Sequence, residues 1–426
     1  MLIIKNASVA DPRSTEIKIT DISIENGIIT SIGNVSDTTG AEVINADGLI
    51  AAPGFVDVHT HFRDPGFPDK ETIHTGALAA AAGGYTTVVC MANTSPAVDN
   101  TETLKYVQEQ AAQEQIHVLQ TSAVTKGRKG EELVDMDTLL SAGAAGFTDD
   151  GSPILDADLT RSAMENAARL NTILSFHEED PAYIQQSGVN SGEAAASLGL
   201  GGADRKAEIV MVERDLALAL ETGCKIDIQH LSAAESVDLI RKAKQKDSKD
   251  LIHCEATPNH FSLTESAVKE YGTLAKINPP LRCEADRLAI IKGLSDGTID
   301  MIATDHAPHT SAEKDQEFSK APSGIIGLET ALSLGIKNLV EPGYISMLQL
   351  IRLMSYNPAK VYGLNAGTLD IGAPADIVLF SADETAHYEK FKSRSCNSPL
   401  LGSYLPGSIH MTLVSGNIVY SKESQQ

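Results

Sequence analysis

Eight short runs of β-branched and other apolar residues alternate with Ala- and Leu-rich stretches through the middle of the chain. Stretches 70–84 and 206–223 have helical composition and end at glycine, as many helices do. Strands that alternate with helices predict a parallel sheet, and eight units over about 310 residues predict a (β/α)₈ barrel. A doubly wound open sheet usually has fewer strands and a Gly-rich turn after the first strand, where this chain has histidines. The runs are FVDVHTH, TTVVCMANT, HVLQTSAV, AAGFTDD, TILSFHE, KIDIQHLS, LIHCEAT and IDMIATDHA.

Both ends of the chain have a different pattern, with short Ile-, Val- and Thr-rich runs separated by polar breaks. Asn26-Gly27 and Ser415-Gly416 lie between such runs and are typical of hairpin turns. We therefore expect small antiparallel strands at each end that meet in one small β-domain. The predicted organisation is a β-domain from 1–53 and 366–426, and a barrel from 54–365.

The first predicted barrel strand ends in His59-Thr60-His61. Residues two apart on a strand point to the same face, so both imidazoles project together, whereas on a helix they would lie on nearly opposite sides. A histidine pair on an apolar strand is compatible with metal binding and with simple core packing, and this motif alone does not separate the two.

Further polar residues fall at the carboxyl ends of other predicted strands. In a (β/α)₈ barrel those ends form one rim, where catalytic groups converge, so the pattern predicts a binuclear metal site. Histidine and carboxylate ligands suit Zn²⁺ best, and one to two ions per chain are expected. A bound ion lowers the pKa of water to about 7, and a carboxylate beside it can accept and return the proton; Asp305 is placed for that role. The residues are Asp149, Asp150, His177, His230, Asp305 and His306.

Composition narrows the class of protein. A length of 426 residues excludes a single small binding module, and the net charge of −23 disfavours nucleic acid and anionic membrane surfaces as partners. No apolar run reaches the roughly 18 residues of a membrane span, and the N-terminus does not resemble a signal peptide, so we expect a cytoplasmic protein. Five cysteines without a CxxC pair argue against a zinc ribbon or a disulfide framework.

Taken in order, several strings resemble bacterial dihydroorotases of the amidohydrolase superfamily, over nearly the whole chain. The resemblance implies a (β/α)₈ metal hydrolase that interconverts L-dihydroorotate and N-carbamoyl-L-aspartate in pyrimidine synthesis. The HxH and TDHAPH motifs indicate only the superfamily, whereas Arg63, Asn93, the TDDG carboxylate and INPPLR narrow the resemblance to dihydroorotase. The strings are DVHTHFRDPG, GGYTTVVCMANTSP, GFTDDG, EATPNHF, INPPLR, IDMIATDHAPH, NPAKVYGL and GTLDIGAPADIVLF.

The same resemblance implies a role for each site residue. His59 and His61 match ligands of one metal, His177 and His230 match ligands of a second, and Asp150 matches a bridging ligand where many relatives carry a carboxylated lysine. The choice of Asp150 over Asp149 rests on the family's spacing to the next metal histidine. Asp305 matches a metal ligand that is also the general acid/base. Residues that match substrate contacts are Arg63, Asn93, Asn278, His309, Ser323 and Gly324.

Some positions differ from the family pattern, and other polar residues lie near the predicted site in sequence. Ala92, Asn259 and Ser323 replace residues common in the family, and only Ser323 lies near a substrate-contact segment. We expect His117, His253 and His260 to be structural, and Glu178–Asp180 to form a solvated loop that caps the next helix rather than an extra cation site. Segment 310–324 is long and polar enough for a lid, although a flexible loop fits equally well.

Two other functions remain compatible with the pattern. One is another cyclic amidase of the hydantoinase or allantoinase type, although its bridging lysine is absent and it has no need of Arg63. The other is a non-catalytic barrel that binds aspartate transcarbamoylase, because some relatives associate with that enzyme. Such barrels usually lose metal ligands, and every expected ligand position is filled here. The resemblance leaves open a homodimer and an association with aspartate transcarbamoylase.

Overall fold

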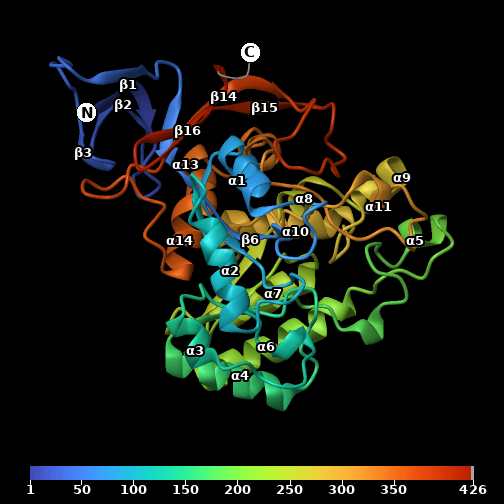
Figure 1. Cartoon of the computed structure of the whole chain (residues 1–426). Helices are drawn as coiled ribbons and strands as arrows, with labels where there is room; N and C mark the ends of the chain where they lie inside the picture. The colour runs from blue at the N-terminus through green and yellow to red at the C-terminus, as the bar shows by residue number, and fades with distance from the viewer. Residues whose placement is uncertain (424–426) are drawn as a thin grey trace.

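The computed structural model describes residues 1–423, which fold into a ring of eight parallel strands and a separate sheet beside it (Figure 1). Two parallel sheets, ordered β6-β7-β8 and β9-β10-β11-β12-β13, make up the ring. Parallel bridges from Ser122 to Phe147 and from Thr60 to His306 join these sheets at both edges, so the ring is closed. The strands are β6 (Phe55–Thr60), β7 (Tyr85–Cys90), β8 (His117–Gln120), β9 (Phe147–Thr148), β10 (Ile173–Phe176), β11 (Lys225–Ile228), β12 (Ile252–Ala256) and β13 (Met301–Ile302).

Helices cover the outside of the ring, and every predicted barrel strand is present. Helix α6 shows why the sequence folds this way: it ends at Gly223, whose φ of 73° is a left-handed conformation that glycine adopts without strain. The helices between barrel strands are α1 (Ile73–Ala82), α2 (Thr101–Ala111), α3 (Met136–Ser141), α4 (Ala157–Leu170), α5 (Glu193–Ser197), α6 (Lys206–Thr222), α7 (Ala234–Lys244), α8 (Pro258–Ser262), α9 (Ala267–Tyr271) and α10 (Glu284–Asp296).

Shorter helical turns follow β13 and fill the connecting loops. After β13 come α11 (Ser311–Lys314), α12 (Ala331–Gly335), η4 (Ile336–Val340), α13 (Met347–Ile351), η5 (Arg352–Tyr356) and α14 (Asn357–Tyr362). The loops contain η1 (Lys126–Arg128), η2 (Pro181–Tyr183) and η3 (Gly272–Ala275). None of the helices described combines the length and apolar character that a membrane crossing needs.

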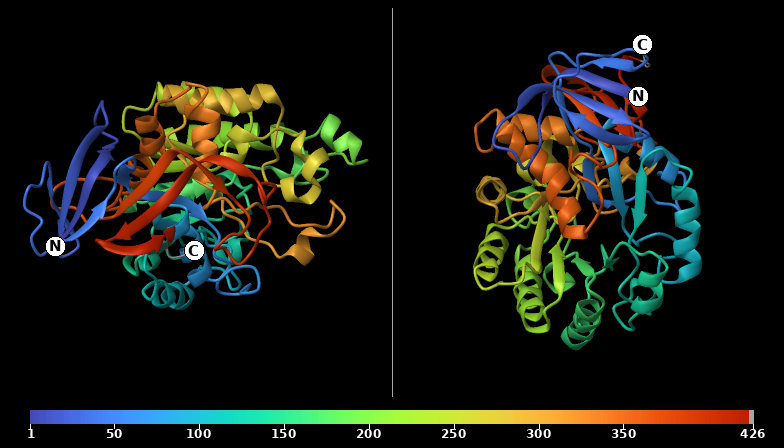
Figure 2. Two further views of the ribbon diagram at one scale, coloured as in Figure 1. Left: turned by 90° about the horizontal axis from the view of Figure 1, so that it is seen from above. Right: turned by 90° about the vertical axis from the view of Figure 1, so that its left-hand side faces the viewer.

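Both ends of the chain build the second sheet, as expected, and Figure 2 shows its blue and red strands side by side against the barrel. Strand β5 pairs with β14 in antiparallel register, for example Ala52 opposite Val378. The strands are β1 (Leu2–Val9), β2 (Lys18–Glu25), β3 (Ile28–Ile32), β4 (Glu42–Asn45), β5 (Ile50–Pro53), β14 (Ile377–His387), β15 (Tyr404–Val414) and β16 (Asn417–Ser421). The domain boundaries at 53/54 and 365/366 stay predictions.

The expectation of purely antiparallel strands at the chain ends is wrong for two of them. Strands β4 and β5 pair with β1 in parallel. Strand β3 runs in the same direction as β1, and residues 33–41 after it lead the chain back to the end of the sheet from which β1 starts, where Glu42 lies opposite Leu2. A strand that begins there runs in the same direction as β1.

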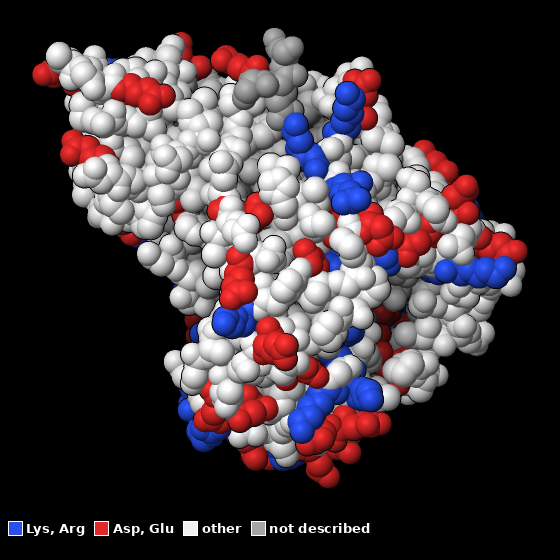
Figure 3. Space-filling view, in the orientation of Figure 1, with Lys and Arg blue, Asp and Glu red and all other residues white. Residues whose placement is uncertain are grey.

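Large apolar cores hold both parts together. The barrel core contains Phe55, Tyr85 and Phe380, none of them exposed, and ring contacts from Phe55 to the other two link the barrel wall to β14. A second core fills the β-domain around Ile4, Ile22 and Ile377. On the face drawn in Figure 3, acidic side chains lie in several groups beside smaller groups of lysine and arginine, which accords with the net charge of −23.

Candidate metal centre and active site

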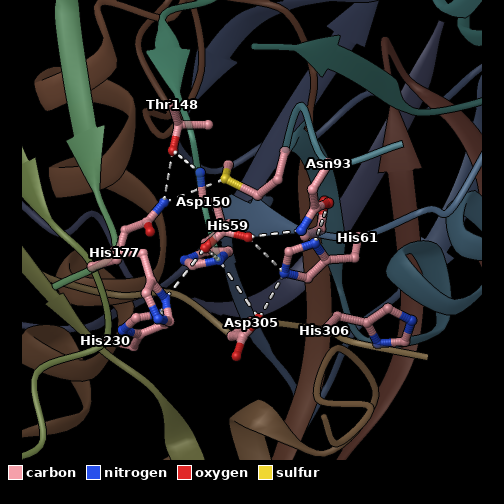
Figure 4. A network of polar contacts seen from close by, with 12 residues as sticks. His59, His61, Asn93, Thr148, Asp150, His177, His230, Asp305 and His306 are labelled. Atoms are coloured by element: carbon pink, nitrogen blue, oxygen red, sulfur yellow. Dashed lines mark hydrogen bonds and ion pairs between the residues drawn. The ribbon is translucent and has the colours of Figure 1, made fainter. Parts of the chain in front are cut away.

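Five strand ends bring the predicted metal ligands together at one rim of the barrel, as Figure 4 shows. His59 lies on β6, and His61 follows one residue after its end. Asp150, His177, His230 and Asp305 each come one to three residues after β9, β10, β11 and β13. The parallel direction of the strands therefore places residues from 59 to 305 in a single cluster.

Two groups of possible ligand atoms lie within this cluster, and Asp150 belongs to both. The first is His59, His61 and Asp150; the second is Asp150, His177 and His230; within each group the ligand atoms lie within 4.8 Å of one another. The Asp150 carboxylate is 3.4 Å from His59 Nε2, 3.6 Å from His61 Nε2 and 3.7 Å from His177 Nδ1. The position of Asp150 between the two histidine pairs is the one that a bridging ligand requires.

Asp149 faces a different part of the rim. Its carboxylate accepts hydrogen bonds from the backbone N–H groups of Val124 and Thr125, at 2.8 and 3.1 Å, and from the Thr125 hydroxyl. Asp149 therefore fixes the loop after β8, and it belongs to neither ligand group.

The carboxylates and imidazoles of the cluster shift one another's pKa values. Burial opposes a charge on His59, but the carboxylates of Glu255 and Asp150 hold its pKa well above the usual value. Burial also opposes the Asp150 charge, yet the surrounding histidines hold the pKa of that carboxyl well below its usual range. For His230, burial and the nearby His177 and His59 lower the pKa well below normal, which leaves the neutral imidazole that metal coordination needs.

Residues behind the ligands support the metal interpretation. His59 Nδ1 lies 2.5 Å from Glu255 Oε1, while its Nε2, which faces the centre, is buried without a hydrogen-bond partner. His177 Nε2 lies 3.1 Å from Glu179 Oε2, and its Nδ1 faces His230. Metal-binding histidines commonly use the second ring nitrogen in this way, so the residues present fit divalent metal ions.

Asp305 lies at the open side of the cluster. Its Oδ1 is 2.8 Å from His61 Nε2 and 3.5 Å from His59 Nε2. The φ angles of Asp305, His230 and Arg63 are 46°, 27° and 58°, in the left-handed region that costs a non-glycine residue of order 1–3 kcal/mol. Such strain is concentrated at functional sites, and here it aims three side chains into one space.

A cavity of about 190 Å³ opens over the cluster and collects all six predicted substrate contacts. This volume is below the roughly 300–1,000 Å³ of pockets for drug-sized ligands, which indicates a small molecule. Arg63 supplies a positive charge, since a guanidinium stays protonated although burial lowers its pKa. The contacts that line the cavity are Arg63, Asn93, Asn278, His309, Ser323 and Gly324.

The side chains that are predicted to contact substrate are held by other residues of the protein. Asn93 donates to Asp150 at 2.9 Å and lies 3.0 Å from His61 Nδ1. Ser323 donates its hydroxyl to Asn278 at 3.1 Å. His309 lies 3.4 Å from Arg63, and burial together with that cation lowers the pKa of His309 to about 2, so this imidazole is neutral.

Comparison with known proteins identifies the family. A family model described as "Dihydro-orotase-like" matches residues 48–236. The chain is 53% identical over 422 residues to the dihydroorotase of Clostridioides difficile (strain 630), which covers 99% of this chain and 100% of that protein. It is 50% identical to the dihydroorotase of Clostridium acetobutylicum over 423 residues, 99% of each chain. The chain belongs to the dihydroorotase family.

Solved structures of a hydantoinase and a dihydropyrimidinase have the same fold. An L-hydantoinase (dihydropyrimidinase) from Arthrobacter aurescens superimposes with a TM-score of 0.89 at 26% identity, covering 99% of this chain and 96% of that one. A dihydropyrimidinase from Brevibacillus agri NCHU1002 gives 0.86 at 22% identity, covering 99% and 95%. These neighbours confirm the predicted barrel with a β-domain, and family membership confirms the prediction of a cyclic amide hydrolase.

Sequence reasoning misplaced or missed several groups of this dihydroorotase-family site. The expectation of a solvated loop at Glu178–Asp180 is wrong for Glu178 and Glu179, which are buried, although Asp180 does cap η2. Glu255 received no role, and a charged residue inside an apolar strand was the available signal. His306 ends a barrel strand but faces Glu71 at 3.4 Å, and Figure 4 shows it turned away from the cluster.

Two buried lysines, Lys276 outside the segment and Lys314 within it, hold the backbone of segment 310–324. Lys276 Nζ donates to the carbonyls of Phe318 and Ala321, both at 2.6 Å. Lys314 Nζ donates to the carbonyls of Pro322 and Gly324, at 2.9 and 3.0 Å. These bonds favour an ordered segment over a loose loop.

Three histidines were expected to be structural, and none of them lines the cavity. His117 bonds to Asp376, His253 to a backbone oxygen and His260 to a threonine hydroxyl.

Proposed function

We propose that this chain catalyses the reversible hydrolysis of L-dihydroorotate to N-carbamoyl-L-aspartate, a step of pyrimidine synthesis. The observation that carries the proposal is Asp150 between two histidine pairs, with Arg63 in the same cavity. The full-length similarity to dihydroorotases supports the same reaction.

The metal-binding part of the proposal assigns one or two zinc ions to the cluster. His59 and His61 would hold one ion, His177 and His230 the other, with Asp150 between them and Asp305 beside the first. Histidine nitrogens and carboxylate oxygens without thiolates suit zinc. When bound, the ions supply an activated water and polarise the amide carbonyl.

Asp305 is the proposed general acid/base. Its carboxylate has the required position, because Oδ1 lies 2.8 Å from His61 Nε2 and the side chain lines the cavity. Asp305 would accept a proton from water as the ring carbonyl is attacked, and would return it to the ring nitrogen as the C–N bond breaks. Ring closure reverses these proton transfers.

The other cavity residues would bind and orient the substrate. Arg63 offers a planar fork that can grip a carboxylate at two points, and its charge gives the cavity a local positive field in a protein whose net charge is −23. Asn93, Asn278, neutral His309 and the Ser323–Gly324 backbone surround the remaining space and would contact the carboxylate and ring. A homodimer, an association with aspartate transcarbamoylase and a cytoplasmic location stay predictions.

A hydantoinase-type activity is the nearest alternative, because solved hydantoinases share the fold. Those resemblances are at 21–26% identity, against 53% to a dihydroorotase. The experiment compares L-dihydroorotate with dihydrouracil, which has the same ring without the carboxylate. A site built around a polar group rejects analogues that lack it by roughly 10⁴-fold, so we expect kcat/KM at least about 10³-fold higher for dihydroorotate. Equal rates, or a preference for dihydrouracil, would favour the hydantoinase type.

A further inference from the structure

A loop of the β-domain reaches across the rim of the barrel to the substrate cavity. The loop connects β14 to β15 and is drawn in red in Figure 1. The Ser395 hydroxyl donates to the Lys70 carbonyl at 2.7 Å, and the Arg394 N–H donates to the Glu71 carboxylate at 3.0 Å. The segment just before Asn397 is therefore fixed to the turn that follows β6.

The side chain of Asn397 lies at the end of this loop segment and forms hydrogen bonds with two segments of the cavity wall. Its Oδ1 accepts a hydrogen bond from the backbone N–H of His309 at 3.0 Å. Its Nδ2 donates to the carbonyls of Ala307 and Gly324, at 3.0 and 3.1 Å. Asn397 is only 2% exposed. All three hydrogen bonds are therefore shielded from solvent. Both amide hydrogens and the amide oxygen of the side chain take part in them.

Both segments that Asn397 joins contain proposed substrate contacts. One carries His309, the other Ser323 and Gly324, and His309 Nε2 lies 2.9 Å from the Ser323 carbonyl. Gly324 is held from two further sides, by the Lys314 ammonium on its carbonyl and by the Lys276 carbonyl on its N–H. The Ala307 N–H donates to the Ile325 carbonyl at 3.0 Å and joins the two segments directly. The Asn397 side chain adds a further link, from Gly324 to Ala307 and to the His309 backbone.

We propose that Asn397 is a positioning residue that sets the distance between His309 and the Ser323–Gly324 backbone and so shapes the substrate-binding wall. The inference rests on the proposed function, because it assumes that these groups contact the substrate. It also gives the β-domain a role in the reaction: one loop of that domain holds two wall segments of a cavity whose proposed metal ligands all come from the barrel.

Asparagine suits this position because the site needs one acceptor and two donors on a short side chain. Aspartate has the same size and keeps an acceptor for the His309 N–H. It would also direct carboxylate oxygen at the carbonyl oxygens of Ala307 and Gly324, which repels both. Alanine would leave the buried His309 backbone N–H and the Ala307 carbonyl without these partners, while the Gly324 carbonyl would keep Lys314. Asn397→Asp preserves the shape of the side chain. It therefore separates the effect of the lost hydrogen bonds from the effect of altered packing.

The test compares Asn397→Ala and Asn397→Asp with Asn338→Ala as a matched control. Asn338 is partly buried and donates to the Ser262 hydroxyl and the Leu334 carbonyl, at 2.9 and 3.0 Å, but it does not line the cavity. Each chain is purified with its metal, and kcat and KM for L-dihydroorotate, bound metal per chain and melting temperature are measured.

We expect both Asn397 variants to remain folded with unchanged bound metal and to lose about 10²-fold in kcat/KM, since misplacement of about 1 Å costs that much. Most of the loss should appear as a KM raised at least about 10-fold, and the control should stay within about 3-fold of wild type. An unchanged KM in both variants, or loss of the fold in both, would overturn the proposal. A wild-type chain that does not convert L-dihydroorotate would instead refute the proposed function.

Discussion

Asp149 and Asp150 are neighbours in sequence with different surroundings, so exchanging each for asparagine tests the assignment of the bridge. Both substitutions replace a carboxylate by a neutral side chain of the same shape. Asp150 contacts His59, His61 and His177, whereas Asp149 accepts bonds from Val124 and Thr125. Any difference between the two variants therefore reflects location and not chemistry.

The structure sets the size of the effect at Asp150. Its oxygens lie 3.4–3.7 Å from three imidazole nitrogens, so a metal ion held by those nitrogens would be in direct contact with the carboxylate. A unit charge pair at 4 Å is worth about 4 kcal/mol at an effective dielectric constant of 20. Loss of that attraction weakens metal binding by about 10³-fold. We therefore expect Asp150→Asn to lose bound metal and at least about 10³-fold in kcat/KM.

The effect at Asp149 should fall on stability. The amide oxygen of asparagine can still accept the hydrogen bonds from the backbone N–H groups of Val124 and Thr125. Its amide nitrogen cannot accept the hydrogen bond that the Thr125 hydroxyl donates. An unsatisfied buried group costs about 1–3 kcal/mol. Asp149→Asn should therefore lower the melting temperature while bound metal is retained and kcat/KM stays within about 10-fold of wild type.

The assay measures zinc per chain, kcat/KM for L-dihydroorotate and melting temperature for wild type and both variants in one buffer. A variant set in which Asp149→Asn loses metal and activity while Asp150→Asn keeps both would refute the bridge assignment. Equal losses in the two variants would show that the rim needs both charges and would refute the separation argued above.

Further substitutions probe the acid/base group, the substrate carboxylate and a buried acid far from the site. Asp305→Asn should lower kcat by at least about 10³-fold in a folded protein, as measured by steady-state kinetics and circular dichroism. Arg63→Met should abolish most of the preference for dihydroorotate over dihydrouracil while bound zinc, measured by elemental analysis, is unchanged. Burial raises the pKa of Glu329 from 4.5 to about 7, so the folded chain binds this proton more tightly than the unfolded chain, and stability falls as pH rises from about 4.5 to about 7. Glu329→Gln should therefore raise the melting temperature by a few degrees at pH 8 and have little effect at pH 4; an equal change at both pH values would contradict this sign.

The barrel and its metal cluster were largely predictable from the sequence, because both depend on local patterns. Each apolar run of four to nine residues specifies a strand, and the parallel arrangement then fixes which ends meet. His59 and His61 needed only the two-residue period of a strand to be placed on one face. The parallel pairing of strands β4 and β5 with β1 was not predicted, because their direction depends on where the connections that precede them lead the chain.

Contacts between distant segments set the limit of sequence reasoning. Nothing in the order Asp149-Asp150 tells which carboxylate turns toward the histidines, since the chain has left strand β9 by then and no longer alternates regularly. Glu255 and Glu179 acquire their roles only when strands from different parts of the chain place them behind His59 and His177. Asn397 lies 73 residues from Gly324, in the loop between β14 and β15, and no motif marks it.

The central claim is a metal-dependent dihydroorotase, and a single preparation tests it. The purified chain is analysed for bound metals and assayed alone on L-dihydroorotate, before and after treatment with a chelator. We expect one to two zinc ions per chain, conversion to N-carbamoyl-L-aspartate, and loss of activity with the chelator while the fold persists, because the barrel has its own large apolar core. An active enzyme without bound transition metal, or a fully metallated chain that does not convert dihydroorotate, would contradict the claim.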